Sequence, residues 1–402
     1  MVRRKTEVSA RAVSFGACAT LLGALGACAP AAQPAPQDAR AAQAAPEAIE
    51  IPLNPPVALL PRERVATGLA NPRGLQPLAD GSLLVSIAGT GDPADPLSGG
   101  IWKLRDVNQD GDFLDPGEHS SILDKQPSRN LFDLVRRDEV FGVAGMAQGG
   151  GDVVVSLADF GGPSKIFRLE NNGDKVVEWS NTHGNVNDLD FDKRRNVWVG
   201  VASTTDEMVE LAQGKPAQRV AKFAPLKSGQ DAVPAYLRYD DITGDVLVTL
   251  FSGSPEGEEG GKGTEIIPRA ASMVKVHAET HTAEPFIVGL TVPTDLEIAD
   301  DGSIYVLEFC DAFLDPVSSR EQMFGGTLHG GFKRFSGRML HIDRKTRAVT
   351  VVATGLDAPT NLARVGNYLY VAEGMGTPGR SIPGPDGKPV LLTGYIERIK
   401  LP

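Results

Sequence analysis

A short phrase recurs along this chain with constant spacing, and it constrains the fold more than any other feature. In residues 68–75, 289–296 and 355–362, Gly-Leu is followed three residues later by proline and three further on by leucine. Each copy continues into a short alternating run: "SLLVSIA", "SIYVLEF" or "NYLYVAEG". Alternation with a period of two predicts β-strands, and a recurring unit of this kind predicts a repeat architecture.

Weaker copies of the unit fill the middle of the chain, at residues 141–179, 186–223 and 233–287. Each offers four short β-branched or aromatic runs separated by turn residues. Six four-stranded units predict an all-β fold, a six-bladed β-propeller over residues 61–402. The last unit stops after its third strand, and "RERVA" (62–66) is expected to supply the fourth and close the ring without an open edge. A β-sandwich requires neither feature.

The N-terminus has the features of an export signal. Basic residues at 3–5 precede an apolar run, 12–27, which is shorter than the roughly 20 residues of a membrane span. The run ends in Leu-Gly-Ala-Cys, which resembles the lipobox of bacterial lipoproteins, so we expect residues 1–27 to be removed and Cys28 to be lipidated. The alternative is an ordinary signal cut near Ala-x-Ala. Residues 28–60, rich in Ala and Pro, are expected to form a tether.

The net charge and the cysteine content indicate which partners and which cellular location suit this protein. The net charge of the chain is −11, and without residues 1–27 it has 36 basic and 50 acidic residues, a net charge of −14. An acidic chain is a poor nucleic-acid binder but suits an exported domain and cation binding. Cys310 alone remains in the repeats, so no internal disulfide is expected. We therefore expect a monomer anchored through Cys28 to the bacterial cell envelope.

Three stretches carry a resemblance to a known family. "VATGLANPRGLQPLADGSLLV", "AVPAYLRYDDITGDVLVTLFSG" and "VGLTVPTDLEIADDGSIYVLEF" resemble the bacterial ScyD/ScyE-type propellers, which are secreted NHL-like proteins. The resemblance covers roughly residues 62–402. It implies the propeller fold and export, and it assigns no reaction or catalytic residue. This chain departs from the family in its long insertions and its lipobox.

Long insertions are predicted to share one face of the propeller. If the strands of a blade are lettered a to d from the axis outward, the b–c loops and d–a links lie on one face, here called the inserted face. Segments 89–99, 253–271, 310–336 and 374–393 all follow a b strand, and repeat proteins commonly bind on such a face. The third segment predicts a lid over the axis, or alternatively a self-packed loop. Its aromatic and related side chains are Phe313, Met323, Phe324, His329, Phe332 and Phe335.

Polar side chains near the axis on that face are the candidate ligand-binding residues. They are His183, Asn187, Asp188, Asp295, Glu308, Asn361 and Glu373. Converging carboxylates and amides suit a divalent cation, as in lactonase-type propellers, although a polar water-filled channel has the same composition. The leading hypothesis is a propeller that binds a small molecule or an envelope protein. The alternatives are a metal-dependent lactonase-like hydrolase and a quinone-dependent sugar dehydrogenase, for which His183 is the axial histidine.

The stretch "DVNQDGDFLDPGE" has the spacing of a calcium loop. Its candidate ligands are Asp106, Asn108, Asp110, Asp112, Asp115 and Glu118. Oxygen donors at alternate positions and Gly111 at the turn match the start of an EF-hand loop, but position 12 is Gly117 and no helices flank the loop. The sequence predicts a structural calcium site, or alternatively a plain Asp/Asn/Gly turn. The motif joins strands c and d, so we expect it at the rim of the opposite face.

Overall fold

A computed structural model of the chain describes residues 47–130, 140–158, 164–170, 175–181, 185–255, 267–313, 332–375, 381–383, 387–391 and 393–402. These residues belong to one compact unit, Glu47–Pro402, and the preceding unit, Met1–Pro46, lies outside them. The described residues contain strands and no α-helix. In this part of the chain nothing has the helical length and apolar character needed to cross a membrane.

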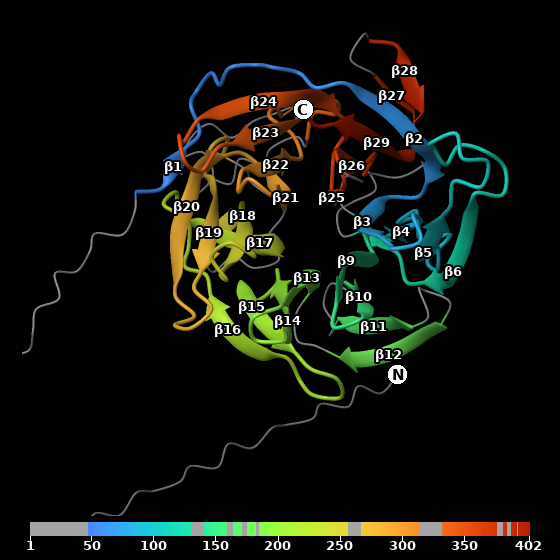
Figure 1. The fold of residues 1–402 in the computed structure, drawn as a ribbon, viewed down its shortest axis with the longest axis horizontal. Coiled ribbons are helices and arrows are strands. Elements are labelled where there is room, and N and C mark those ends of the chain that lie inside the picture. Colours follow the sequence, from blue (N-terminus) through green and yellow to red (C-terminus); the bar gives the residue numbers. More distant parts are fainter. Residues whose placement is uncertain are drawn as a thin grey trace, which may run out of the picture. The chain divides into compact units, whose positions relative to one another are not determined.

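Six four-stranded antiparallel sheets surround a central axis (Figure 1). Blades 1 to 3 consist of β3 (Pro72–Pro77), β4 (Leu83–Ile87), β5 (Gly99–Leu104) and β6 (His119–Gln126); β9 (Val143–Gly149), β10 (Asp152–Leu157), β11 (Lys165–Glu170) and β12 (Lys175–Asn181); and β13 (Val186–Asp192), β14 (Val197–Ala202), β15 (Glu207–Leu211) and β16 (Gln218–Lys222). A short pair, β7 (Arg129–Asn130) and β8 (Val140–Phe141), lies between blades 1 and 2 in the sequence.

The second half of the chain repeats the pattern. Blades 4 to 6 consist of β17 (Gln230–Tyr239), β18 (Val246–Pro255), β19 (Ala271–Val276) and β20 (Ala283–Leu290); β21 (Pro293–Ile298), β22 (Ile304–Glu308), β23 (Gly337–Ile342) and β24 (Val349–Leu356); and β25 (Asn361–Val365), β26 (Tyr368–Glu373), β29 (Gly394–Lys400) and β2 (Arg62–Leu69). The predicted all-β six-bladed propeller is thereby confirmed.

The core is divided among the interfaces between neighbouring blades. Among the described residues, six clusters of buried aliphatic and aromatic side chains each fill one interface between adjacent sheets. Between blades 4 and 5, for example, Met273 packs in one cluster with Leu296 and Leu340, all fully buried. Each blade therefore buries both faces, which explains why its inner strands contain apolar residues at most positions.

Strand β2 closes the ring as the sequence predicts. It pairs antiparallel with β29, from Arg62 opposite Ile399 to Leu69 opposite Gly394, so the first blade strand in the sequence completes the last blade. Val65, Ala66 and Leu69 are buried in the cluster between blades 6 and 1.

Residues 47–60, which we expected to belong to the tether, lie against the outer edges of two blades. Strand β1 (Ile49–Glu50) pairs parallel with β20 of blade 4. Further on, the Ala58 and Leu60 amides donate to the carbonyls of Val351 and Val352 in blade 5. The apolar side chains of Ile49 and Ile51 are buried there, and burial of this kind is what a composition-based linker assignment does not detect.

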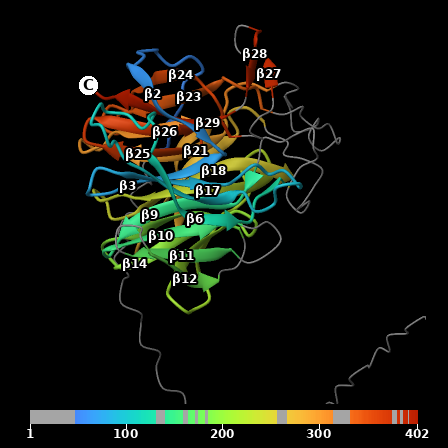
Figure 2. The same cartoon turned by 90° about the vertical axis from the view of Figure 1, so that its right-hand side faces the viewer.

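The two faces of the ring differ (Figure 2). The hairpin formed by β27 (Ser381–Pro383) and β28 (Pro389–Leu391) lies in the b–c insertion of blade 6, on the side opposite the C-terminus. The β5–β6 connection, which contains the calcium-like motif, is a c–d turn and so belongs to the face opposite the insertions.

Candidate functional site

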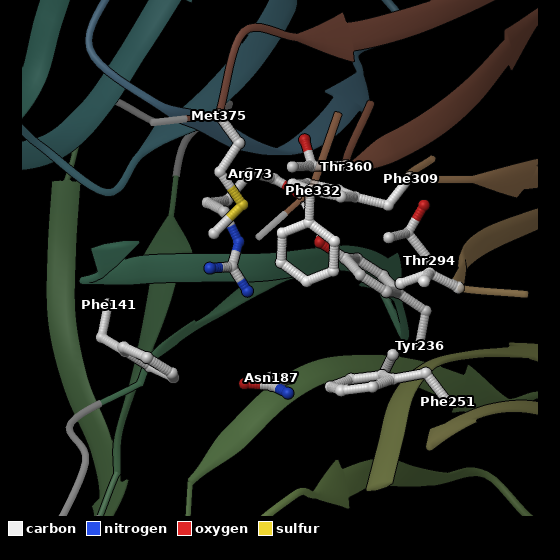
Figure 3. A pocket seen from close by; sticks show the side chains of 12 residues that line it. Arg73, Phe141, Asn187, Tyr236, Phe251, Thr294, Phe309, Phe332, Thr360 and Met375 are labelled. Carbon is white, nitrogen blue, oxygen red and sulfur yellow. Dashed lines mark hydrogen bonds between the residues drawn. The ribbon is translucent and has the colours of Figure 1, made fainter. Parts of the chain in front are cut away.

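A pocket lies on the axis at the inserted face, where the innermost strands begin and the b strands end (Figure 3). The empty space there is about 570 Å³, part of which is open to solvent. All six blades or their links contribute to this axial pocket, which is lined by Arg73, Phe141, Asn187, Ala235, Tyr236, Phe251, Val292, Thr294, Phe309, Phe332, Thr360 and Met375. Apolar side chains form most of the wall, and a few polar groups lie at the bottom.

The polar floor follows directly from the repeat. Each blade has a residue two positions before the last leucine of the repeated phrase, or before Met146, which takes the place of that leucine in blade 2. These residues form a ring around the axis, here called the upper ring. Its members are Arg73, Ala144, Asn187, Ala235, Thr294 and Thr360. In blades 1, 3, 4 and 5 the strand register shifts at this position, which leaves the residue outside the regular ladder. A bulge redirects a side chain in this way, and the members from these four blades line the pocket together with Thr360 of blade 6.

Tyr236 closes the channel below the pocket. It belongs to the next ring down, the lower ring, whose members are Gly74, Gly145, Asp188, Tyr236, Asp295 and Asn361. The Tyr236 side chain is buried, and its hydroxyl donates to the carbonyl of Arg73 in the opposite blade, 3.3 Å away. Burial raises the pKa of Tyr236 to about 12, so the hydroxyl keeps its proton and the hydrogen bond at neutral pH.

A single guanidinium, that of Arg238, holds the acidic residues below Tyr236. Its nitrogens lie 3.0 Å from an Asp188 oxygen and 2.7 Å from an Asp295 oxygen, and its Nε lies 4.0 Å from Glu297. Asp190, also close to the channel, accepts the amide of Tyr239. The acids therefore outnumber the cation that they share.

Burial controls the protonation of this group. It raises the pKa of Asp188 to about 8, and those of Asp295 and Glu297 to about 7, while the charge of Arg238 acts in the opposite direction. The pKa of Arg238 is in turn raised by Asp295 and Asp188 against the effect of its own burial. The channel therefore carries less negative charge at neutral pH than its composition indicates.

The lower ring also joins one blade to the next. Asp188 accepts the amide of Leu237 at 3.2 Å, and Asp295 accepts the amide of Leu362 at 2.7 Å. Asn361 donates to Asp295 and accepts from the amide of Leu75. Three of the seven predicted axial residues, Asp188, Asp295 and Asn361, thus come together, and they do so as a structural network around Arg238.

Glu308 and Glu373 lie elsewhere and brace their own blades. Glu308 accepts the amide of Thr291 and pairs with Arg338, each at 2.5 Å. Glu373 accepts the amide of Asp357 at 2.7 Å and the hydroxyl of Tyr395 at 3.1 Å. Each carboxylate therefore fixes the d–a link that leads into or out of its repeat, which explains why the two occupy equivalent positions.

Of the two remaining candidate residues at the axis, one lines the pocket and the other lies outside the described residues. Asn187 lines the pocket, and its amide oxygen accepts from Asn185. His183 lies outside the described residues, as do Met323, Phe324 and His329 of the expected lid. Phe332 belongs to that segment and forms part of the pocket wall, in edge contact with Phe309.

Metal binding at the axis finds no support in the geometry of these residues. Across the described ranges, no three His, Cys, Asp or Glu side chains are grouped as metal ligands. A guanidinium lies where the Asp188 and Asp295 carboxylates converge, so a cation there would have to displace Arg238.

The 106–118 loop folds around its own carboxylates. Asp106 accepts the amides of Asp110 and Gly111, and buried Glu118 accepts those of Val107 and Asp115. The Asn108 amide nitrogen lies between two carboxylates, 2.9 Å from Asp110 and 2.6 Å from Asp115. Asp112 caps the next turn by accepting the amide of Leu114. The same loop touches the closing blade, because the Phe113 amide donates to Val65 and Arg398 donates to the Gly111 carbonyl.

Three residues of the site, Arg73, Tyr236 and Arg238, are missing from the sequence-based candidates. In the repeat, Arg73 is equivalent to Asn187 and Tyr236 is equivalent to Asp188, and Arg238 follows Tyr236 by two residues. The signal was therefore available: aligning the phrases by their leucine places Arg73 in the same ring as Asn187. A metal site predicts acidic and amide ligands, so basic residues at the same positions do not fit that prediction.

Comparison with known proteins supports the fold alone. Neither the protein-family models nor the curated proteins give a match to this chain. A Thermus thermophilus structure described as a putative oxidoreductase (glucose dehydrogenase) has a TM-score of 0.50 and 16% identity, with 85% of this chain and 99% of that chain covered. A Bacteroides thetaiotaomicron protein of unknown function has a TM-score of 0.51 and 9% identity, covering 83% and 70% respectively. Virginiamycin B lyase of Staphylococcus aureus, at 9% identity and covering 85% and 99%, has a TM-score of 0.46.

Proposed function

We propose that this protein is a lipid-anchored propeller of the bacterial cell envelope, of the ScyD/ScyE type, that binds a small ligand in its axial pocket. The observation that carries the binding function is the pocket itself: an apolar cavity at the mouth of the channel, with polar groups at its floor. Concave, mostly apolar sites with a few convergent polar groups are the usual form of small-molecule sites. Anchoring through Cys28 rests on the lipobox-like segment before it.

Binding fits the site better than a metal-dependent hydrolase does. A lactonase-like hydrolase needs carboxylates free to hold a cation, whereas Asp188 and Asp295 are engaged with Arg238. A quinone-dependent dehydrogenase needs a catalytic histidine, and the histidine that the sequence offers, His183, lies outside the described residues.

Filling the pocket is expected to abolish binding of a neutral apolar probe. Wild-type protein should bind N-phenyl-1-naphthylamine saturably, and Ala235→Trp should remove this binding because the indole occupies the cavity that Ala235 lines. Probe fluorescence measures the binding. Ala348→Trp, an exposed position between β23 and β24, is the matched control and should bind normally. Unsaturable binding in the wild type, or equal binding by Ala235→Trp, would contradict the proposed function.

We also propose that the 106–118 loop holds a structural calcium ion. Support comes from the spacing of its oxygen donors and from the two carboxylates, Asp110 and Asp115, that lie on either side of the Asn108 side chain. A rotation of that side chain would direct its oxygen toward the same point. Because the loop is hydrogen-bonded to Val65 and Arg398, a bound ion would stabilise the seam between blades 1 and 6.

Calcium is expected to raise the thermal unfolding midpoint of the wild-type protein. Extracellular sites of this kind bind with dissociation constants of about 0.1–1 mM, so about 10 mM calcium should add roughly 1.4–2.7 kcal/mol. Asp110→Ala should lose this increment. Asp301→Ala, which removes a similar carboxylate from the turn at Ser303, should retain it. A wild-type midpoint that does not respond to calcium would show that the loop is a plain turn.

A further inference from the structure

Arg73 stands apart from the other members of the upper ring. The equivalent positions in the other five blades hold alanine, asparagine or threonine, so this ring has one charged member. The Arg73 residue is only 7% exposed. In Figure 3 its guanidinium points into the pocket, between Phe141 and Phe332 and toward Asn187.

The charge of Arg73 is not neutralised by any carboxylate in the described ranges. One guanidinium nitrogen donates to the carbonyl of Val140 at 3.0 Å, while the buried Nε has no hydrogen-bond partner in this part of the structure. The acidic members of the lower ring, Asp188 and Asp295, are bound to Arg238. A buried arginine without a counter-ion is costly, because its charge has been taken out of water. A bound anion would supply the counter-charge that the described residues do not.

The side chains around Arg73 indicate what kind of molecule would carry the anionic group. Phe251, Phe309 and Phe332 form a continuous apolar wall with Met375, so the body of the ligand must be aromatic or aliphatic. Beside the guanidinium, the protonated hydroxyl of Tyr236 and the amide of Asn187 provide neutral polar contacts. A planar carboxylate matches the paired N–H groups of a guanidinium better than a single-point acceptor does.

We propose, building on the proposed binding function, that the axial pocket takes a small carboxylic acid with an aromatic or aliphatic body, whose carboxylate pairs with Arg73. The ligand lies with its apolar part against the phenylalanine wall and its acid toward the floor. Tyr236 separates it from Asp188 and Asp295, which are bound to Arg238.

The test compares two probes of nearly the same shape, the charged naphthalene-2-carboxylate and the neutral naphthalene-2-carboxamide. In the wild-type protein the carboxylate should bind at least about tenfold more tightly, because a charge-assisted pair replaces a neutral contact. Arg73→Met should make the two affinities equal, and Arg73→Lys should restore most of the preference. Isothermal titration calorimetry measures both affinities, and thermal unfolding establishes that each variant is folded.

A control variant and a second probe distinguish failure of the carboxylate proposal from failure of the binding function on which it rests. Arg219 lies on the outer strand of blade 3 and pairs with Glu207. Arg219→Met should therefore leave the preference for the carboxylate over the carboxamide unchanged. Equal wild-type affinities, no carboxylate binding at millimolar concentration, or a preference that persists in Arg73→Met would overturn the proposal. In each of those cases, N-phenyl-1-naphthylamine binding that Ala235→Trp still blocks would show that the pocket binds apolar ligands of another class.

Discussion

Arg238→Met is expected to lower the free energy of unfolding by about 3–5 kcal/mol, the range measured when one partner of a buried ion pair is removed. The variant keeps most of the side-chain volume but leaves Asp188 and Asp295 without the guanidinium that lies within 3.0 Å of each. It also loses the hydrogen bond to the Leu362 carbonyl in blade 6. Chemical denaturation of the wild-type and variant proteins measures the difference.

The pH dependence of this loss distinguishes an electrostatic cause from a packing defect. Burial raises the pKa of Asp188 to about 8 and that of Asp295 to about 7, above the value of about 3.9 in an unfolded chain. Both groups bind protons more tightly when folded, so their contribution to stability falls as the pH rises from about 4 to 8. Without Arg238 this fall is steeper, and the loss should be larger near pH 8 than near pH 5.

A matched control uses an arginine on the surface. Arg194→Met breaks the pair with Glu279, in which both side chains are more than half exposed, and should cost less than about 1 kcal/mol at either pH. If Arg238→Met were equally mild, or if its effect were independent of pH, the central role assigned to this arginine would be wrong.

The propeller could be predicted from the sequence because its signal is repeated. The Gly-Leu-Pro-Leu phrase recurs with fixed spacing, and a strand missing at the end matches a spare one, residues 62–66, at the beginning. Each copy reinforces the others, so an error in one strand does not change the blade count. Closure by β2 followed for the same reason.

The site was less predictable, because its residues act on partners in other blades. Nothing local indicates that Asp295 meets Arg238 of the preceding blade, or that Tyr236 reaches across the axis to Arg73. Acidic residues close to an axis suggest a cation, and the sequence does not say whether that cation is a metal or a guanidinium. Glu308 and Glu373 were placed at the correct end of the b strands, but their orientation depends on Arg338 and Tyr395, which lie in the neighbouring c strands.

Removal of β2 is the most severe change expected for the fold, and a series of N-terminal truncations isolates it. Versions that begin at Glu47, Pro61 and Asn71 differ first by the segment 47–60 and then by β2. The version beginning at Pro61 loses the pairing of β1 with β20 and the buried Ile51, so it should unfold cooperatively at a lower midpoint. It is the control for chain shortening as such.

The version beginning at Asn71 should lose its cooperative unfolding transition altogether. Burial of Val65 and Leu69 is worth roughly 1.5–3 kcal/mol each, and their loss alone is comparable with the net stability of a typical domain. Strand β29 would also become an open edge along its whole length, and the Phe113 amide would lose its acceptor, so the seam between blades 6 and 1 would be weakened from both sides. Calorimetry measures the transition. A single sharp transition within about 2 kcal/mol of the Pro61 version would mean that the ring does not depend on closure by β2, and that the contacts between blades hold it without this strand.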